Sequence, residues 1–257
     1  MRLAVFVVLA IGTPARLAGA DPSTDRVFTA PTAWLPPAGG LVATGTIDLR
    51  QVFAARLDSS VVVGYGLGGV AAVDLGTDTD VRACTNCGDT RALPIYLGRA
   101  SFRLGAKQDA WFRGMPALVF GLRTSFAASG AFRDVTVSDA YVVGSRAVGP
   151  LRVHGGVELI DARFSDQGRE VSLGPRPRPI GGLEWTPHQY PQTALMADIA
   201  FVPRLERTGV ALEWVAGWGV RYQAYTWGAI DLAVRHRQGD ELGDTTVMMR
   251  LTGVFAN

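Results

Sequence analysis

The segment GVALEWVAGWGVRYQA, residues 209–224, decides the fold because apolar and polar side chains alternate along it. Its even positions are Val210, Leu212, Trp214, Ala216, Trp218, Val220, Tyr222 and Ala224. Its odd positions include Glu213, Gly217, Gly219, Arg221 and Gln223. A helix repeats its faces every 3.6 residues and would not sort side chains in this way. The segment therefore predicts a β-strand, and one longer than the roughly 5–6 residues typical of soluble proteins.

The same two-residue period recurs along most of the chain. In the last such segment Val247, Met249 and Leu251 share one face, while Thr246 and Arg250 share the other. We predict strands at residues 42–52, 59–66, 69–76, 94–106, 116–128, 138–148, 151–164, 178–187, 193–204, 208–224, 227–237 and 245–255. Residues 59–76 could instead form one interrupted strand, which would lower the number of strands. The even number and the length near 10 residues are typical of bacterial barrels that cross a bilayer.

The connections between these segments alternate between short and long. Gly149-Pro150 and residues 66–69 are tight turns. Longer polar links fall at residues 77–93, 129–137, 165–177 and 238–244. Short periplasmic turns and longer external loops are the rule in outer-membrane barrels. We therefore expect an all-β protein with a single closed antiparallel transmembrane β-barrel of about 12 strands, within a range of 10–12.

A soluble sandwich exported from the cytoplasm is the alternative, because its strands also alternate. Two features favour the membrane barrel. Charges of both signs occupy the polar face in mid-strand, which suits a lumen. Aromatic residues lie on the apolar face near strand ends, where interfacial girdles occur: Tyr96, Phe126, Tyr141, Trp185, Phe201, Tyr222, Trp227 and Phe255.

The first 20 residues are typical of a secretory signal peptide. Arg2 precedes an apolar stretch at residues 3–12, and Ala18-Gly19-Ala20 fits the small-residue cleavage rule. An inner-membrane anchor would need about 20 apolar residues. We expect the mature chain to begin at Asp21, residues 21–40 to form a lead-in or a partial plug, and residues 41–257 to form the barrel. The expected location is the bacterial outer membrane.

The charge balance argues against nucleic acid as a partner. The whole chain has 25 basic and 23 acidic residues. Removal of Arg2 and Arg16 with the signal peptide leaves 25 − 2 = 23 basic residues, so the mature chain is formally neutral. Nucleic-acid binding is usually accompanied by a basic surface.

Three short motifs resemble YjbH-like outer-membrane proteins and related barrels. They are PTAWLPPAGGLVATG at residues 31–45, GGLEWTP at residues 181–187, and the final RHRQGDELGDTTVMMRLTGVF. In those proteins a Pro-Thr-Ala element and a Pro/Gly turn lead into the first strand. The resemblance implies a barrel and a role in exopolysaccharide secretion. The last strand ends with Phe255 followed by Ala256 and Asn257, so the strict terminal aromatic read by the barrel-insertion machinery is absent.

The polar strand faces supply the candidate functional residues. The predicted lumen-lining residues are Arg50, Arg99, Arg103, Arg123, Arg152, His154, Glu158, Glu213, Arg221, Asp231, Arg235 and Arg250. Arg146, Arg237, Asp48, Glu184 and Asp198 are placed on the same faces. Arginines outnumber acids in this set, so an open lumen would favour a polar, anionic solute or polymer. The alternative is that these charges pair with one another and fill the barrel.

Cys84 and Cys87 form a CTNC motif within the first long loop. A disulfide that closes the loop tip is the expected state, since an oxidising compartment permits it. Zinc would need two further ligands, and a redox CxxC usually precedes a helix. No metal or other cofactor is therefore expected.

Two further functions remain open. His154 and Glu158 share a strand face and could serve a barrel-embedded hydrolase, although no recognisable nucleophile motif accompanies them. Alternatively, loops 77–93 and 165–177 could make the protein a surface adhesin or scaffold. We expect a structural or pore-forming barrel and not an enzyme. Its partners would be outer-membrane lipid, the insertion machinery, and polysaccharide or small anionic solutes.

Overall fold

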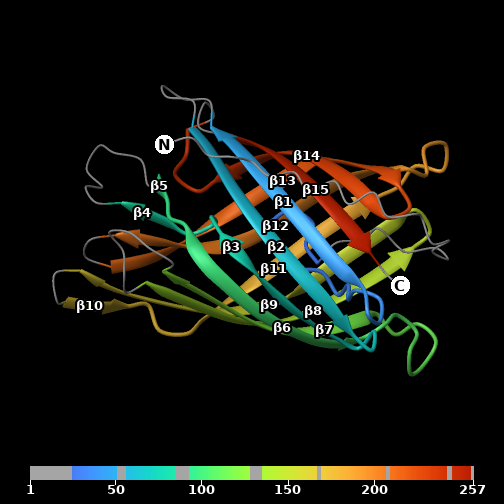
Figure 1. The fold of residues 1–257 in the computed structure, drawn as a ribbon, viewed down its shortest axis with the longest axis horizontal. Coiled ribbons are helices and arrows are strands. Elements are labelled where there is room, and N and C mark those ends of the chain that lie inside the picture. Colours follow the sequence, from blue (N-terminus) through green and yellow to red (C-terminus); the bar gives the residue numbers. More distant parts are fainter. Residues whose placement is uncertain are drawn as a thin grey trace.

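The computed structural model describes residues 25–50, 56–84, 93–127, 135–166, 169–206, 209–241 and 245–255. The described part is all-β (Figure 1), and it contains no helix long and apolar enough to cross a membrane. The predicted signal peptide, residues 1–20, lies outside the described residues. The strands are β1 (Leu41–Arg50), β2 (Arg56–Leu67), β3 (Ala71–Asp78), β4 (Arg82–Cys84), β5 (Leu93–Pro94), β6 (Leu97–Ala106), β7 (Ala117–Ala127), β8 (Thr136–Val148), β9 (Leu151–Asp166), β10 (Arg169–Ser172), β11 (Arg176–Trp185), β12 (Thr193–Glu206), β13 (Gly209–Tyr225), β14 (Gly228–Arg237) and β15 (Thr246–Phe255).

Twelve of these strands form a closed antiparallel wall, which confirms the predicted fold class. Their order is β1, β2, β3, β6, β7, β8, β9, β11, β12, β13, β14 and β15. The wall closes where the first strand pairs with the last, from Leu41 with Phe255 to Arg50 with Thr246. The remaining strands are short and were not predicted. β4 and β5 pair with each other, β4 also lies beside β12, and β10 forms a hairpin with β9.

Alternation along each strand separates an outer apolar face from an inner polar face. In β13 Trp218 is 51% exposed, whereas Glu213 and Arg221 are only 5% and 4% exposed. Because successive side chains point to opposite faces of a strand, the buried ones project into the enclosed lumen. The decisive period of two therefore sorts side chains between the outside and the inside of the barrel.

The two ends of the barrel differ in their connections. At one end, which we call the turn end, lie the links at residues 68–70, 107–116, 149–150, 186–192 and 226–227, together with Leu41 and Phe255 (right in Figure 1). At the other, the loop end, lie the end of β1 and the start of β2, the end of β7 and the start of β8, and the ends of β3 and β9. Gly68 and Gly69, both with positive φ, make the turn that splits residues 59–76 into two strands. The open question about this segment is thus resolved in favour of twelve wall strands.

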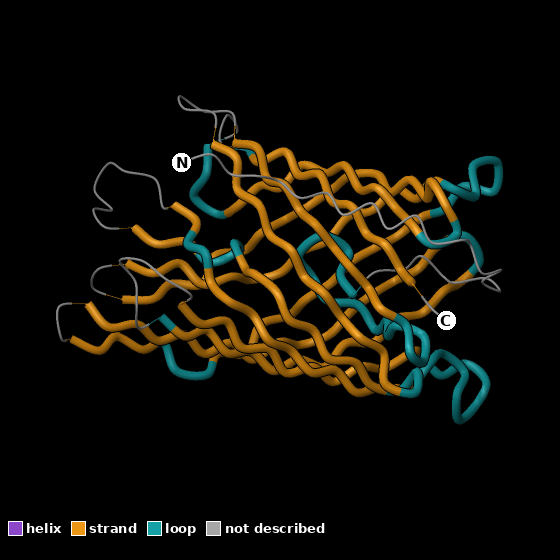
Figure 2. Tube along the Cα trace, viewed as in Figure 1, coloured by secondary structure: helices purple, strands orange, loops and turns teal. Residues whose placement is uncertain are grey.

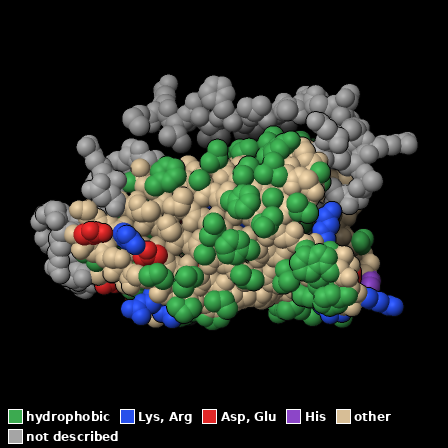
Figure 3. Space-filling model, turned by 90° about the horizontal axis from the view of Figure 1, so that it is seen from below, with side chains coloured by type: hydrophobic (Ala, Val, Ile, Leu, Met, Phe, Trp, Pro, Cys, Tyr) green, Lys and Arg blue, Asp and Glu red, His purple; other side chains and the backbone are tan. Residues whose placement is uncertain are grey.

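The outer surface is an apolar belt suited to lipid. In Figure 3 hydrophobic side chains spread over the middle of the visible face, and charged side chains lie toward its two ends. Leu75, Val157 and Leu232 are more than half exposed on this surface. So large an exposed apolar surface is unusual for a soluble protein, whereas a barrel in a bilayer requires it.

Two predicted orientations are wrong, and both lie on β8. Tyr141 is buried and faces the lumen, where the missing side chain of Gly121 leaves room for its ring. Arg146 is exposed on the outer face and donates a hydrogen bond to the Gly114 carbonyl in a turn-end link. The odd positions of β8 face inward, so an aromatic residue near the strand end does not always belong to the girdle.

Candidate functional site

The lumen is occupied by the chain segment that precedes the first strand. Residues 25–36, here called the lumenal segment, are buried or half-buried and contact several wall strands. Figure 2 shows this segment as a loop inside the barrel. About eight strands make a barrel that its own side chains can fill. A twelve-stranded wall encloses more space, and the lumenal segment supplies the additional filling.

One wall carboxylate holds the middle of the lumenal segment. Asp198 Oδ2 on β12 accepts hydrogen bonds from the backbone N–H groups of Phe28, Thr29 and Ala30, at 3.0, 2.6 and 2.7 Å. Asp198 itself is only 6% exposed. A buried carboxyl oxygen needs hydrogen-bond donors, and buried backbone N–H groups need an acceptor. Each therefore satisfies the other, across about 170 residues of sequence.

Wall arginines hold the carbonyl groups of the same segment. Arg250 on β15 donates to the carbonyls of Arg26, Val27 and Phe28 and also bonds to Asp231 on β14. Arg103 on β6 donates to the Trp34 carbonyl at 3.2 Å.

Both arginines also have a carboxylate partner in the wall. Arg103 makes a two-point ion pair with Asp74 on β3, with distances of 2.8 and 3.1 Å. Asp231 receives a second arginine, Arg221, at 2.8 Å. The barrel wall and the lumenal segment therefore share one polar network.

Apolar contacts complete the fit of the lumenal segment. Val27 and Phe28 pack with Met196, Ala233 and Met248, whereas Ala30, Ala33 and Leu35 pack in a second buried cluster. Two wall glycines make room for the first of these groups. A Cβ at Gly182 would lie 2.7 Å from Val27 Cγ2, and a Cβ at Gly217 would lie 2.9 Å from Phe28 Cδ2.

Ionised acids anchor the loop-end part of the network. Burial raises the pKa of Asp25, but Arg103, Arg99, Arg26 and Arg250 outweigh it and lower that pKa to about 2. Burial also raises the pKa of Asp80, in the link after β3. The nearby Arg235, Arg26 and Arg237 outweigh it and hold that pKa below its ordinary value. Both carboxylates stay charged at neutral pH and act as fixed counterions.

Most of the predicted lumenal residues are buried inside the wall. These are Arg99, Arg103, His154, Glu158, Glu213, Arg221, Asp231, Arg235 and Arg250, while Arg123 and Arg152 are half-buried. Arg50 lies at the end of β1, and its side chain is not described. Arg123 pairs with Asp139 and Glu158, and Arg235 pairs with Asp48 and Asp80. The charges are thus used to join neighbouring strands.

Four lumenal acids were not predicted from the sequence. Asp58, Asp74, Asp78 and Asp139 are buried on strand faces that point inward. With them, arginines no longer outnumber acids among the buried lumenal side chains described. Among the described lumenal residues the excess of positive charge inferred from sequence is therefore absent. The alternation itself was the available signal, since Asp74 stands between the exposed Val73 and Leu75.

His154 and Glu158 do not act as a pair in this structure. His154 Nδ1 lies 2.7 Å from the Ser145 hydroxyl, and its Nε2 lies 3.4 Å from Glu184. Glu158 bonds to Arg123 at 3.0 Å. The Ser145 hydroxyl also accepts a hydrogen bond from the backbone N–H of Ala33. The geometry gives Ser145, which also contacts His154, a role in holding the lumenal segment.

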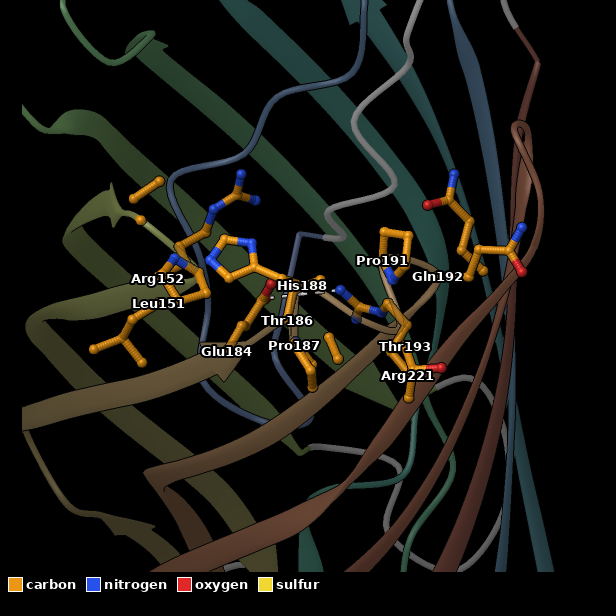
Figure 4. A pocket seen from close by; sticks show the side chains of 15 residues that line it. Leu151, Arg152, Glu184, Thr186, Pro187, His188, Pro191, Gln192, Thr193 and Arg221 are labelled. Carbon is orange, nitrogen blue, oxygen red and sulfur yellow. Dashed lines mark ion pairs between the residues drawn. The ribbon is translucent and has the colours of Figure 1, made fainter.

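A polar vestibule opens at the turn end of the lumen. It has a volume of about 390 Å³, and its lining includes Arg152, Glu184, His188, Gln192 and Arg221. Figure 4 shows the two arginines approaching the space from different strands, with an ion pair between Arg221 and Glu184 at 3.7 Å. Deeper in the lumen the cavities shrink to about 50 and 20 Å³. The smallest of these has room for about one water molecule.

Cys87 and the side chain of Cys84, which form the predicted disulfide, lie outside the described residues. In the part of the chain that is described, no group of three or more His, Cys, Asp or Glu side chains is arranged to hold a metal ion.

Comparison with known proteins gives a fold but no sequence family. No protein-family model matches the chain, and no curated protein matches it either. The NanC porin matches with a TM-score of 0.51 and 14% identity, over 84% of this chain and 99% of its own. The KdgM porin in complex with disordered oligogalacturonate matches with a TM-score of 0.49 and 7% identity, over 84% of this chain and 99% of its own. The translocator domain of the autotransporter NalP from Neisseria meningitidis matches with a TM-score of 0.41 and 13% identity, over 85% of this chain and 88% of its own.

The likeness to the NanC porin establishes the fold alone, because the identity is low. That fold and the apolar belt around the wall agree with each other. The chain has the porin-like fold of a bacterial outer-membrane β-barrel, and its outer surface is suited to that membrane.

Proposed function

We propose that the protein is a gated outer-membrane pore that its own lumenal segment closes. The observation that carries this proposal is the anchoring of residues 28–30 on Asp198 in mid-lumen. The anchoring contacts are hydrogen bonds, ion pairs and small apolar contacts, all of which are reversible. Displacement of the segment would leave a twelve-stranded lumen wider than its wall side chains can fill.

The vestibule supports a polar, anionic solute as the ligand. The strong charges in its lining are Arg152, Arg221 and Glu184, so positive charge prevails at this mouth. Short turns of outer-membrane barrels face the periplasm, which would place the vestibule on that side. A role in exopolysaccharide secretion, implied by the YjbH-like motifs, stays a prediction.

Single-channel conductance in planar bilayers tests the gate. We expect the intact protein to be mostly closed and a variant lacking residues 25–36 to give steady channels. Heat-modifiable migration on gels shows whether the variant has folded. Steady conductance through the intact protein would contradict closure. A folded deletion variant without conductance would contradict the pore.

Ion selectivity of the opened variant tests the solute class. The reversal potential measured across a salt gradient should have the sign expected for an anion-selective channel, because positive charge in a narrow mouth excludes cations. Arg152→Gln in the vestibule should reduce this preference. Arg113→Gln is the matched control, since Arg113 is exposed in a turn-end link outside the vestibule lining. Cation preference, or equal effects of both changes, would argue against an anionic solute.

A further inference from the structure

The hydrogen-bonded wall is interrupted between β11 and β12. Their ladder runs from Trp185 with Leu195 to Gly181 with Ile199 and then stops. Toward the loop end, β11 continues to Arg176 beside β9, and β12 continues to Glu206 beside β13. The freed edge of β12 pairs instead with β4, in parallel, through Arg204, Leu205 and Glu206. We call this unpaired stretch of the wall the seam.

Prolines prevent the ladder from closing the seam. Continuing the register of Gly181 with Ile199 would place Pro177 opposite Pro203, and Pro179 lies between. Proline has no N–H to donate to a ladder, and it is therefore found at free strand edges. Prolines in both strands therefore account for the interruption of the ladder.

The strands overlap at the seam instead of meeting edge to edge. On β12 the outer-face residue Ile199 is 45% exposed, but Leu205 on the same face is only 1% exposed. Leu205 packs in one apolar cluster with Ile160, Ala162 and Phe164, which lie on the inner face of β9. The outer face of β12 therefore lies beneath the inner face of β9. Apolar contacts therefore close the seam in place of backbone hydrogen bonds.

The seam lies where the apolar belt meets the polar boundary. On β9 the outer residues Val157 and Leu159 are exposed and apolar, whereas Asp161 and Arg163 follow as an ion pair. Pro179 is the partner of Val157 in the ladder, and Arg176 is the partner of Ile160. The gap thus begins at the level of hydrocarbon and ends at the level of headgroups.

Two arginines at the seam have no ionic partner among the described residues. Arg176 is exposed and Arg178 is half-buried, and neither forms an ion pair with another described residue. The Arg178 guanidinium lies 5.5 Å from the centre of the Phe201 ring, on the facing surface of β12. Its buried Nε has no hydrogen-bond partner in the described structure. Arginine is well suited to binding phosphate through several N–H groups.

We propose that the seam is a lateral binding site for a lipid with an anionic, phosphorylated headgroup. The headgroup would bind Arg176 and Arg178, and an acyl chain would enter between the overlapping ends of β9 and β12. Charge complementarity and the position of the gap at the belt boundary support this occupant. The site does not depend on the proposed gate, because lipid would reach it from the membrane whether or not the lumen conducts.

Photolabelling of the full-length protein in phosphatidylcholine vesicles tests this site. The probe is phosphatidylglycerol with a photoreactive group in its acyl chain, compared with phosphatidylcholine carrying the same chain. We expect phosphatidylglycerol to label Ile160, Ala162 and Phe164 on β9 and Phe201 and Leu205 on β12, which pack in the overlap away from bulk lipid, and phosphatidylcholine to label them weakly. Equal labelling by both lipids, or labelling confined to the outer belt, would overturn the proposal.

Charge variants identify the headgroup contact. Arg176→Gln and Arg178→Gln should each lower phosphatidylglycerol labelling about fivefold, since one arginine near an anionic lipid contributes ~1 kcal/mol. Arg163→Gln is the matched control, because its charge is already paired with Asp161 at the same end of the barrel. An equal loss in the control would overturn the specific role of the two seam arginines.

A covalent staple tests entry between the strands without changing any charge. Ile160→Cys and Leu205→Cys, in a chain without Cys84 and Cys87, can be joined by a short bifunctional thiol reagent. The stapled protein should lose the internal labelling, whereas the unstapled double variant should keep it. Unchanged labelling after stapling would overturn entry through the overlap.

Discussion

Phe28 lies directly above Gly217, so that a Cβ at position 217 would approach the Phe28 ring to 2.9 Å and an Asp198 carboxylate oxygen to 2.6 Å. A glycine on the wall is therefore a condition for the lumenal segment to lie where it does. The relationship links a small residue in β13 to a segment almost 190 positions earlier in the chain.

Gly217→Val should displace the lumenal segment while leaving the wall closed, because the added atoms overlap Phe28 and Asp198. We expect more frequent channel opening and faster thiol labelling of a Thr29→Cys reporter in a chain without Cys84 and Cys87. Gly155→Val is the control, since a Cβ at Gly155 meets nothing within 4 Å. Equal labelling of the two variants would show that the glycine is not needed for the fit.

Asp198→Ala should release the same segment for a different reason. Three buried N–H groups would lose their acceptor, and each unsatisfied donor costs about 1–3 kcal/mol. Channel opening should therefore rise at least as much as in Gly217→Val. Asp161→Ala, which removes an outer-face carboxylate paired with Arg163, should leave conductance unchanged. If the Asp198→Ala channel stays closed, Asp198 is not the residue that anchors the lumenal segment.

Asp231→Asn should destabilise the whole barrel. Asp231 is 1% exposed and accepts bonds from both Arg221 and Arg250. Removing one partner from a buried ion pair costs about 3–5 kcal/mol, because the other charge remains buried. The measurement is the free energy of unfolding in urea. Arg163→Gln, on an exposed pair, should change it by less than about 1 kcal/mol.

Closure of the channel should resist moderate acid. The pKa of Asp25 is 3.8 in its ordinary state and about 2 here. A lowered pKa in the folded state adds stability that is present above pH 3.8 and is lost as the pH falls toward 2. Asp80 has a lowered pKa as well and acts in the same direction. Conductance of the intact protein should stay low from pH 7 to 4 and rise only below that. Opening between pH 6 and 5 would contradict control by these carboxylates.

Leu232→Arg should impair insertion into lipid vesicles. Leu232 is 56% exposed on the outer face of β14. An arginine facing lipid near mid-membrane costs about 2–4 kcal/mol. Folding yield into vesicles, measured by gel migration, should fall, and Leu232→Phe should fold normally. Unimpaired folding of the arginine variant would mean that this face does not meet hydrocarbon.

The wall could be predicted from sequence because its cause is local. A period of two marks each strand, and the turn at Gly68-Gly69 separates β2 from β3. Orientation failed only on β8, where Tyr141 was assigned to the girdle by residue type although its odd position faces inward. Residue type was a weaker guide than position in the alternation.

The contents of the lumen could not be predicted in the same way. The bonds from Asp198 to residues 28–30 join positions about 170 apart, and no periodic pattern specifies which wall carboxylate meets which backbone N–H. Because acids such as Asp74 and Asp139 were not recognised as lumenal, the balance of positive and negative charge in the lumen was not predicted. The end of the β11–β12 ladder was not predicted either, although Pro177 and Pro203 lack the N–H group that a ladder needs.

The pairing of Leu41 with Phe255 sets an order on assembly. The ring of strands cannot be completed until the last strand has reached the first, and the lumenal segment is joined directly to that first strand. Once the ring is complete, residues 25–36 are surrounded on all sides by hydrogen-bonded backbone except along the seam. The lumenal segment must therefore take its place against the curved sheet before β15 pairs with β1. Otherwise it must enter later, through one end of the closed barrel.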